Sequence, residues 1–189
     1  MRTETISGYL DRLAAGGVPA GGGSGAAAPA LLAAQAAALL ASVAREDPQD
    51  GAGPGAGADE ARRRLTARVR AAADGLREMA LKLADDEAGS GAVADARARG
   101  AVIMIAEAGV ELAGKLLPVT DRAALPDLAT ALETARAAAR SARTGVEALL
   151  TAVTDPAAHA ELTALTAGVD PLTTCADHLI ADTTHRLHG

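Results

Sequence analysis

Apolar residues recur at helical spacing along most of the chain, and no segment alternates apolar and polar residues as a half-buried strand does. The pattern predicts helices at residues 3–15, 24–45, 58–98, 102–117, 127–153, 156–167 and 171–187. The segment 24–45 is apolar almost all round, which is typical of a central, buried helix. The predicted fold class is all-α, a single-domain antiparallel helical bundle over residues 1–189.

Glycine and proline mark the expected ends of these helices. Residues 47–57 combine two prolines with four glycines, which predicts a flexible loop. The long helix over 58–98 has a candidate break at Gly89 or Gly91, and we expect the following helix to begin after Gly100. Pro156 and Pro171 stand near the starts of the last two predicted helices, where a proline is well tolerated.

The composition changes how the core of such a bundle is expected to pack. The chain is 49% hydrophobic but only 1% aromatic, with Tyr9 as the single aromatic residue. Alanine, leucine and valine must therefore supply the buried surface, which favours helices in close contact.

Charge and cysteine content bear on partners and compartment. The formal net charge of -6 argues against nucleic-acid binding, because phosphate contacts need a basic face. Cys175 is the only cysteine, so no disulfide framework is expected, and we interpret it as a small buried or half-buried side chain. No apolar run resembles a signal peptide or a membrane span, and we expect a cytoplasmic protein without membrane partners.

The most distinctive local motif is the glycine-rich run Pro19-Ala20-Gly21-Gly22-Gly23-Ser24 directly before the apolar helix. A helix start offers unpaired backbone N–H groups and the positive end of the helix dipole, so this turn could cradle an anion. It lacks the lysine and the spacing of a phosphate-binding P-loop. From the residues alone, a structural turn that lets two helices pack is an equally good interpretation.

Two further groups of polar residues are candidate sites. His178, Asp182 and His185 share one side of the last helix, and a frayed polar surface is favoured over a metal site because nothing completes a buried ligand set. We therefore expect no metal. Three arginines at positions 136, 140 and 143 repeat at helical spacing; they could face an anionic ligand or a partner's carboxylates, but a solvated stripe paired with neighbouring glutamates is favoured.

Three segments carry a family resemblance: the opening Ile6–Ala14 followed by Pro19–Ala27, the acidic run Leu83–Ala88 with Ala92-Val93 after it, and the alanine-rich helix Asp127–Leu150. Together they resemble the formiminotetrahydrofolate cyclodeaminase and methenyltetrahydrofolate cyclohydrolase family. The likeness extends to about residue 150.

The resemblance implies an all-helical homodimer that binds a small molecule, a tetrahydrofolate derivative, as substrate and needs no cofactor. In the cyclohydrolase reaction, water adds to a cationic methenyl carbon; in the cyclodeaminase reaction, a ring nitrogen attacks a formimino carbon and ammonia leaves. Both need carboxylates beside an amidinium. Asp86 and Asp127 match family acids and are assigned catalytic roles, and Gly21, Gly22, Gly23 and Ser24 are assigned to substrate binding.

The chain departs from the family pattern at polar positions. The family's Tyr-Lys-Leu-Pro stretch is missing between Ala96 and Ala101, which leaves Arg97 and Arg99 as substitute cations for substrate binding. An asparagine-rich approach to the aspartate is replaced by residues 120–127, a further asparagine falls at Gly145, and the aromatic after the acidic run falls at Ser90. Two alternatives to folate chemistry follow: a C–N bond or cyclisation reaction on a changed substrate in specialised metabolism, or an inactive dimeric interaction protein.

Overall fold

The computed structural model describes residues 26–45, 56–85 and 91–189, and these ranges are built from helices without any strand. This confirms the all-α prediction. The helices are α2 (Ala27–Val43), α3 (Ala56–Asp85), α4 (Ala92–Leu116), α5 (Leu125–Leu150), α6 (Pro156–Ala167) and α7 (Val169–His188), with 3-10 turns η1 (Leu117–Val119) and η2 (Arg122–Ala124) between α4 and α5.

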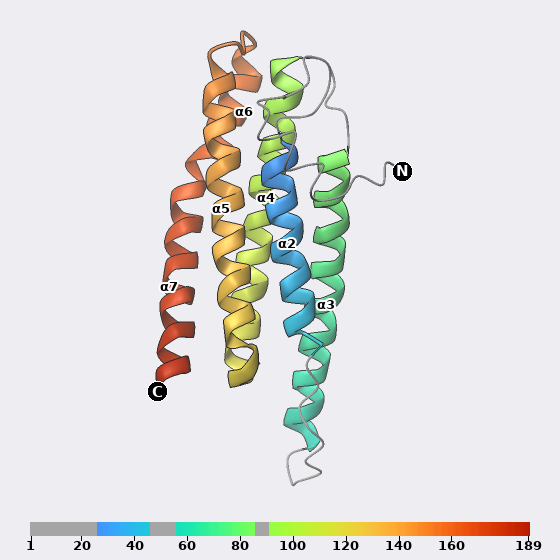
Figure 1. The fold of residues 1–189 in the computed structure, drawn as a ribbon. Helices are drawn as coiled ribbons and strands as arrows, with labels where there is room; N and C mark the ends of the chain where they lie inside the picture. The colour runs from blue at the N-terminus through green and yellow to red at the C-terminus, as the bar shows by residue number, and fades with distance from the viewer. Residues whose placement is uncertain (1–25, 46–55, 86–90) are drawn as a thin grey trace, which may run out of the picture.

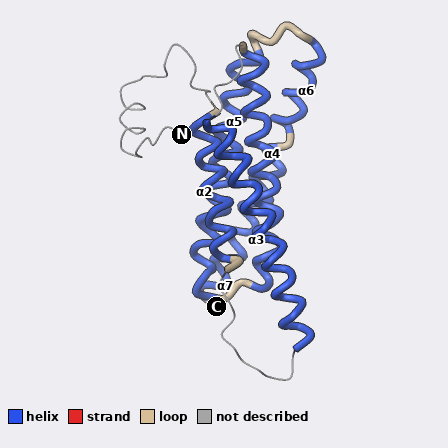
Figure 2. Tube along the Cα trace, turned by 90° about the vertical axis from the view of Figure 1, so that its right-hand side faces the viewer, coloured by secondary structure: helices blue, strands red, loops and turns tan. Residues whose placement is uncertain are grey.

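The long helices lie side by side in an elongated antiparallel bundle (Figure 1, Figure 2). Helices α2, α4 and α5 pack on one another, α3 lies against α2 and α4, and α7 lies against α5 and α4. Helices α2 and α4 begin, and α3 and α5 end, at the end of the bundle where α6 lies, which we call the upper end (Figure 1). The opposite end, where η1, η2 and the start of α5 lie, is called the lower end. Helix α2 contacts three other long helices and nine of its residues are buried, but Ala28, Gln35 and Ser42 are exposed along one face, so the prediction of a central, buried helix is correct only in part.

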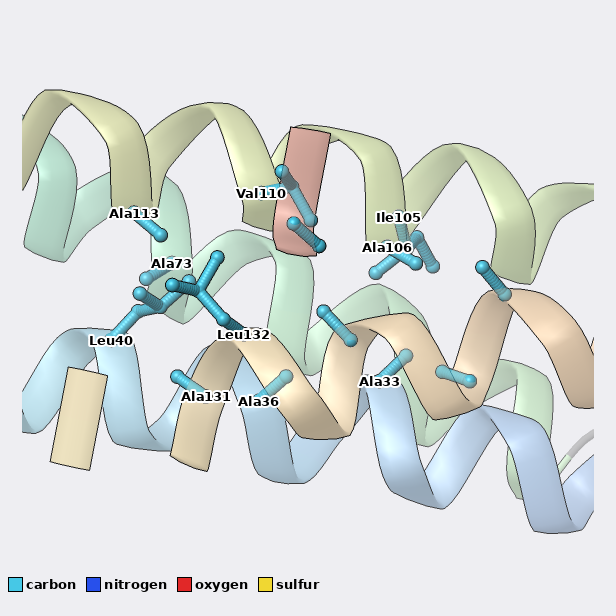
Figure 3. Close-up of a cluster of buried hydrophobic side chains, with 14 of the residues drawn as sticks. Ala33, Ala36, Leu40, Ala73, Ile105, Ala106, Val110, Ala113, Ala131 and Leu132 are labelled. Carbon is cyan, nitrogen blue, oxygen red and sulfur yellow. The ribbon is translucent and has the colours of Figure 1, made fainter. Parts of the chain in front are cut away.

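Small side chains fill most of the core between these helices. Leu40 of α2 and Leu132 of α5 are each 1% exposed and lie among alanines of α2, α3, α4 and α5 (Figure 3). Alanine at the contact positions lets helix backbones approach closely, so dispersion contacts replace the bulk that aromatic side chains give other cores. The aromatic-poor composition is thereby accommodated without loss of burial.

The boundary between the predicted helices 58–98 and 102–117 differs from the structure, because α3 ends at Asp85 and residues 92–98 belong to α4. Helix α4 runs through Gly100 and begins at Ala92, ten residues before the predicted start. Gly100 is a packing residue, because a Cβ there would lie 2.8 Å from Cδ1 of Leu165 on α6. Gly91, with φ of 134°, stands directly before α4 in a backbone conformation that favours glycine, as the predicted break requires.

The predicted loop 47–57 is correct at most in part. Helix α3 begins at Ala56, so the last two residues of that range are helical, while residues 47–55 lie outside the described part of the chain, as does the predicted helix 3–15. At the other end of the molecule α6 begins at Pro156 as predicted, with the Asp155 carboxylate accepting a hydrogen bond from the backbone N–H of Ala157 at 3.1 Å. Over the three described ranges, no helix combines the length and apolarity that crossing a membrane would take.

Candidate functional site

The start of α2, the end of α3 and the first turns of α4 meet at the upper end, and most of the predicted site residues lie in these segments or close to them in the sequence. Gly21–Ser24 and Asp86 lie outside the described residues, but the chain re-enters the described part at Ala26, the N-cap of α2, and leaves it at Asp85, the last residue of α3. Arg97 and Arg99 lie in the first turns of α4, toward the same end of the bundle (Figure 1). Of the predicted site residues that the structure describes, Arg97 and Arg99 therefore lie toward this end.

Asp127 is the exception. It lies in the first turn of α5, at the lower end, and its side chain is exposed. Asp127 precedes Gly145 by 18 positions on one continuous helix, which is about 27 Å at 1.5 Å per residue. Within one chain, Asp127 is therefore not brought together with Arg99, which lies against Gly145.

A small cavity lies at the lower end, and Asp127 is not among the residues that line it. The cavity there measures about 10 Å³, enough for roughly one water molecule, and is lined by the ends of α2, α3 and α4 together with the 3-10 turns. Arg62 of α3 closes it by an ion pair with Asp121, at 2.8 Å. A flat bicyclic substrate does not fit in this cavity.

Arg99 is the most enclosed cation of the predicted site. Its side chain is 15% exposed and its Nε lies 3.5 Å from Oδ2 of Asp95, one helical turn earlier and itself 22% exposed. Arg99 Nε and Asp95 Oδ1 are buried without a hydrogen-bond partner. No hydrogen bond joins the two terminal nitrogens of Arg99 to any group in the described part of the chain, which leaves them available to an anion.

Gly145 of α5 makes room for this guanidinium. A Cβ at position 145 would lie 1.8 Å from Nη1 of Arg99, 2.4 Å from Cζ and 2.8 Å from Cδ. Position 145 is where the family resemblance places an asparagine, and Arg99 stands where the Tyr-Lys-Leu-Pro stretch is missing. Two of the departures from the family pattern are thus in direct contact, and an arginine side chain occupies the space that an asparagine side chain would need.

Arg97 has a different environment. It is 55% exposed and donates a hydrogen bond from Nη2 to Oε2 of Glu161 on α6, at 3.1 Å. This exposed ion pair links α6 to the first turns of α4. Arg97 is consequently a less enclosed cation than Arg99.

The arginine stripe of α5 faces α7. Arg136 pairs with Glu133 on its own helix and with Asp177 on α7. Burial lowers the pKa of the Arg136 guanidinium, but the hydrogen bond to Asp177 and the charges of both carboxylates outweigh it, so this pKa lies above its ordinary value. The predicted pairing with glutamates is confirmed for Glu133, while the link to α7 was not predicted.

Arg143 repeats this arrangement two turns later. Its Nε donates to Glu147 at 2.7 Å, as predicted, and its Nη1 donates to Asp170 of α7 at 2.5 Å. The hydrogen bonds to Glu147 and then to Asp170 raise the pKa of the Arg143 guanidinium. The arginine stripe therefore lies along the contact between α5 and α7 as well as in solvent. We call this contact, bridged by Arg136–Asp177 and Arg143–Asp170, the seam.

The remaining candidates lie on the surface of α7. Cys175 is exposed, so its interpretation as a buried or half-buried side chain is wrong; the small residue that points inward on this turn is Ala176. Across residues 26–45, 56–85 and 91–189, no group of three or more histidine, cysteine, aspartate or glutamate side chains lies close enough together to hold a metal ion.

Comparison with known proteins identifies the architecture. The chain matches the crystal structure of formiminotetrahydrofolate cyclodeaminase from Thermotoga maritima with a TM-score of 0.68, over 99% of this chain and 98% of that one, at 14% sequence identity. No protein-family model matches the sequence, and neither does any curated protein. The fold is therefore that of the cyclodeaminase, as the family resemblance implied; at this identity the likeness concerns the fold alone.

Proposed function

We propose that this protein is an enzyme that acts on a C–N bond of a one-carbon-substituted tetrahydrofolate, a cytoplasmic reaction that needs no cofactor. The shared fold with a folate cyclodeaminase supports a folate-related enzyme. The observation that carries the proposal is Arg99, an enclosed guanidinium toward the upper end whose terminal nitrogens have no hydrogen-bond partner among the described residues. Ala26 and Asp85, the described residues next in sequence to the glycine-rich run and to Asp86, lie at the same end.

The role that we propose for each site residue follows from the charges of the substrate. The glutamate tail of a folate carries carboxylates, which a guanidinium binds through two parallel hydrogen bonds. Arg99 is the better placed cation for this, since Arg97 is shared with Glu161. Gly21–Ser24 would let the substrate approach the backbone closely, and Asp86 would stabilise the amidinium carbon and move protons during addition or ring closure.

We further propose that the protein is a homodimer in which each site takes its second carboxylate from the other copy. A single chain holds Asp127 about 27 Å along α5 from the helix position that Arg99 contacts. A two-fold axis across the bundle reverses the direction of one copy, so that the partner's Asp127 approaches the upper end. The outward face of α2 is suited to such contact, because no residue from Ala26 to Ala44 is charged and Leu31, Leu32 and Leu39 are only half-buried.

The direct test is hydrolysis of methenyltetrahydrofolate by the purified chain, followed by the loss of near-ultraviolet absorbance. We expect the wild type to exceed the rate in buffer. Asp127→Asn should lower kcat by about 100-fold, because it removes a proton-transfer group. Arg99→Gln should raise KM by about tenfold with little change in kcat, because its contact is made equally before and during the reaction.

The exposed Arg70 on α3, which has no ion pair within the described ranges, supplies the control for lost charge. Arg70→Gln should leave both constants unchanged. Absence of acceleration over buffer, or full activity of Asp127→Asn, refutes the folate proposal.

One observation favours a second candidate, a dimeric interaction protein without catalysis. Asp127 and the end of α3, which precedes Asp86, lie at opposite ends of the bundle, so one chain cannot offer both carboxylates to one ligand (Figure 1). A changed substrate in specialised metabolism would instead keep Arg99 as an anion-binding group. A dimer that binds neither methenyltetrahydrofolate nor other folates would favour the interaction protein.

A further inference from the structure

The seam between α5 and α7 has a regular ion-pair register. Arg136 pairs with Asp177, and Arg143 pairs with Asp170. The two arginines are seven residues apart on α5 and the two aspartates are seven residues apart on α7, as expected for antiparallel helices that keep one face together over two turns. Each bridge brings a cation of α5 against an anion of α7.

Midway between the two bridges the pattern lacks its anion. Arg140 occupies the intermediate position of α5, and the residues of α7 at the matching level are Thr173 and Thr174. Arg140 is exposed, and its guanidinium takes part in no hydrogen bond or ion pair in the described part of the chain. The seam opens here into a groove of about 410 Å³, lined by Arg140, Arg143, Thr144, Glu147, Val169, Asp170 and Thr173.

We propose that this groove, the α5–α7 groove, binds a small molecule through a phosphate or carboxylate group seated on Arg140. Three further charged residues line the groove, and they are already joined to one another, since the Arg143 guanidinium donates to both Glu147 and Asp170. The Arg140 guanidinium is the charged group of the groove without an ion-pair partner in the described part of the chain, and an oxyanion on it completes the alternation of the seam. The volume is in the range of small-molecule sites.

Hydroxyl groups on both walls add hydrogen-bonding capacity. Thr144 and Thr173 donate to the backbone carbonyls of Arg140 and Asp170, at 3.1 and 3.0 Å. A hydroxyl can rotate away from such a local partner and donate to a bound oxyanion. The groove lies on the α7 side of α5, whereas Arg99 contacts α5 from α4, so the inference does not depend on the proposed folate chemistry.

The probes are inorganic phosphate and acetate, titrated into the 15N-labelled full-length protein at constant ionic strength. We expect saturable shifts of the Thr144 and Thr173 amide signals for at least one of them, and the tighter probe indicates which kind of head group the natural ligand carries. Arg140→Gln should weaken binding by about tenfold, as loss of a charged hydrogen-bond donor does. Arg70→Gln, which removes the same charge on α3, should leave it unchanged.

A second variant supplies the missing anion. Thr173→Asp places a carboxylate opposite Arg140, so it should abolish the phosphate and acetate shifts while the protein stays folded, and adding Arg140→Gln should not restore them. Shifts that stay linear up to about 100 mM of both probes overturn the proposal. The proposal is also overturned if Arg140→Gln and Arg70→Gln weaken binding of the probes equally, or if the Thr173→Asp variant binds them as tightly as the wild type.

Discussion

Replacement of Gly145 by alanine tests the contact on which the Arg99 site is built. The new Cβ would lie 1.8 Å from Nη1, 2.4 Å from Cζ and 2.8 Å from Cδ of Arg99, so the whole outer half of that side chain must leave. Asp95, 22% exposed and with one oxygen already lacking a partner, then loses its cation. Such a loss costs about 2 kcal/mol of unfolding free energy.

The substitution also has a favourable component. Glycine to alanine in a helix interior gains about 1 kcal/mol. The expected net effect of Gly145→Ala is therefore a destabilisation of about 1 kcal/mol, or a fall in Tm of about 2–4 °C for a chain of this size. Gly75→Ala is the matched control, because Gly75 is exposed within α3 and nothing lies within 4 Å of its added Cβ, so this variant should gain about 1 kcal/mol.

Urea denaturation followed by far-ultraviolet circular dichroism measures both variants, and a double-mutant cycle isolates the contact. In an Arg99→Ala background the collision is gone, and Gly145→Ala should stabilise as Gly75→Ala does. The coupling between positions 99 and 145 is then about 2 kcal/mol. Equal stabilisation by Gly145→Ala and Gly75→Ala in the wild-type background would refute the placement of Arg99 over α5.

Three further outcomes follow from the described helices. Leu132→Ala, at a position 1% exposed, should lower the free energy of unfolding by about 2–5 kcal/mol, seen as a lower urea midpoint. Arg136→Gln removes a half-exposed bridge from α5 to α7 and should cost about 0.5 kcal/mol, less at high salt; a loss that salt does not change would contradict it. Folding raises the pKa of Arg136, so its contribution to the free energy of unfolding is full at lower pH and is lost only as pH rises through that strongly alkaline pKa. The difference in stability between wild type and Arg136→Gln should therefore not change through titration of this arginine between about pH 6 and pH 9.

Helix type and order followed from local information, whereas glycine roles did not. Pro156 with the cap Asp155 marks the start of α6 in the sequence, because capping depends on neighbours in the chain. Gly100 was wrongly interpreted as a helix boundary. It lies inside α4, where a Cβ would meet the side chain of Leu165, 65 positions away in the sequence. A glycine that separates helices and one that lets helices touch look alike until their tertiary neighbours are known.

The polar sites show the same division. Sequence spacing predicted that Arg143 would pair with Glu147 on its own helix, but the partner on α7, Asp170, depends on the register of two helices in the bundle. Similarly, Arg97 and Arg99 were both predicted as substitute cations, and only the fold separates the enclosed Arg99, which lies against Gly145, from the exposed Arg97. The separation of Asp127 from the upper end could not be foreseen either, because it follows from the direction in which α5 runs.

Subunit complementation tests the central claim, a site shared between two copies, most directly. The Arg99→Gln and Asp127→Asn variants should each have low activity at low substrate concentration. The two variant proteins are then mixed and allowed to exchange subunits. In a mixed dimer one site carries both substitutions and the other carries neither, so random exchange should restore about a quarter of the wild-type rate of methenyltetrahydrofolate hydrolysis. A mixture no more active than its two components would contradict the shared site.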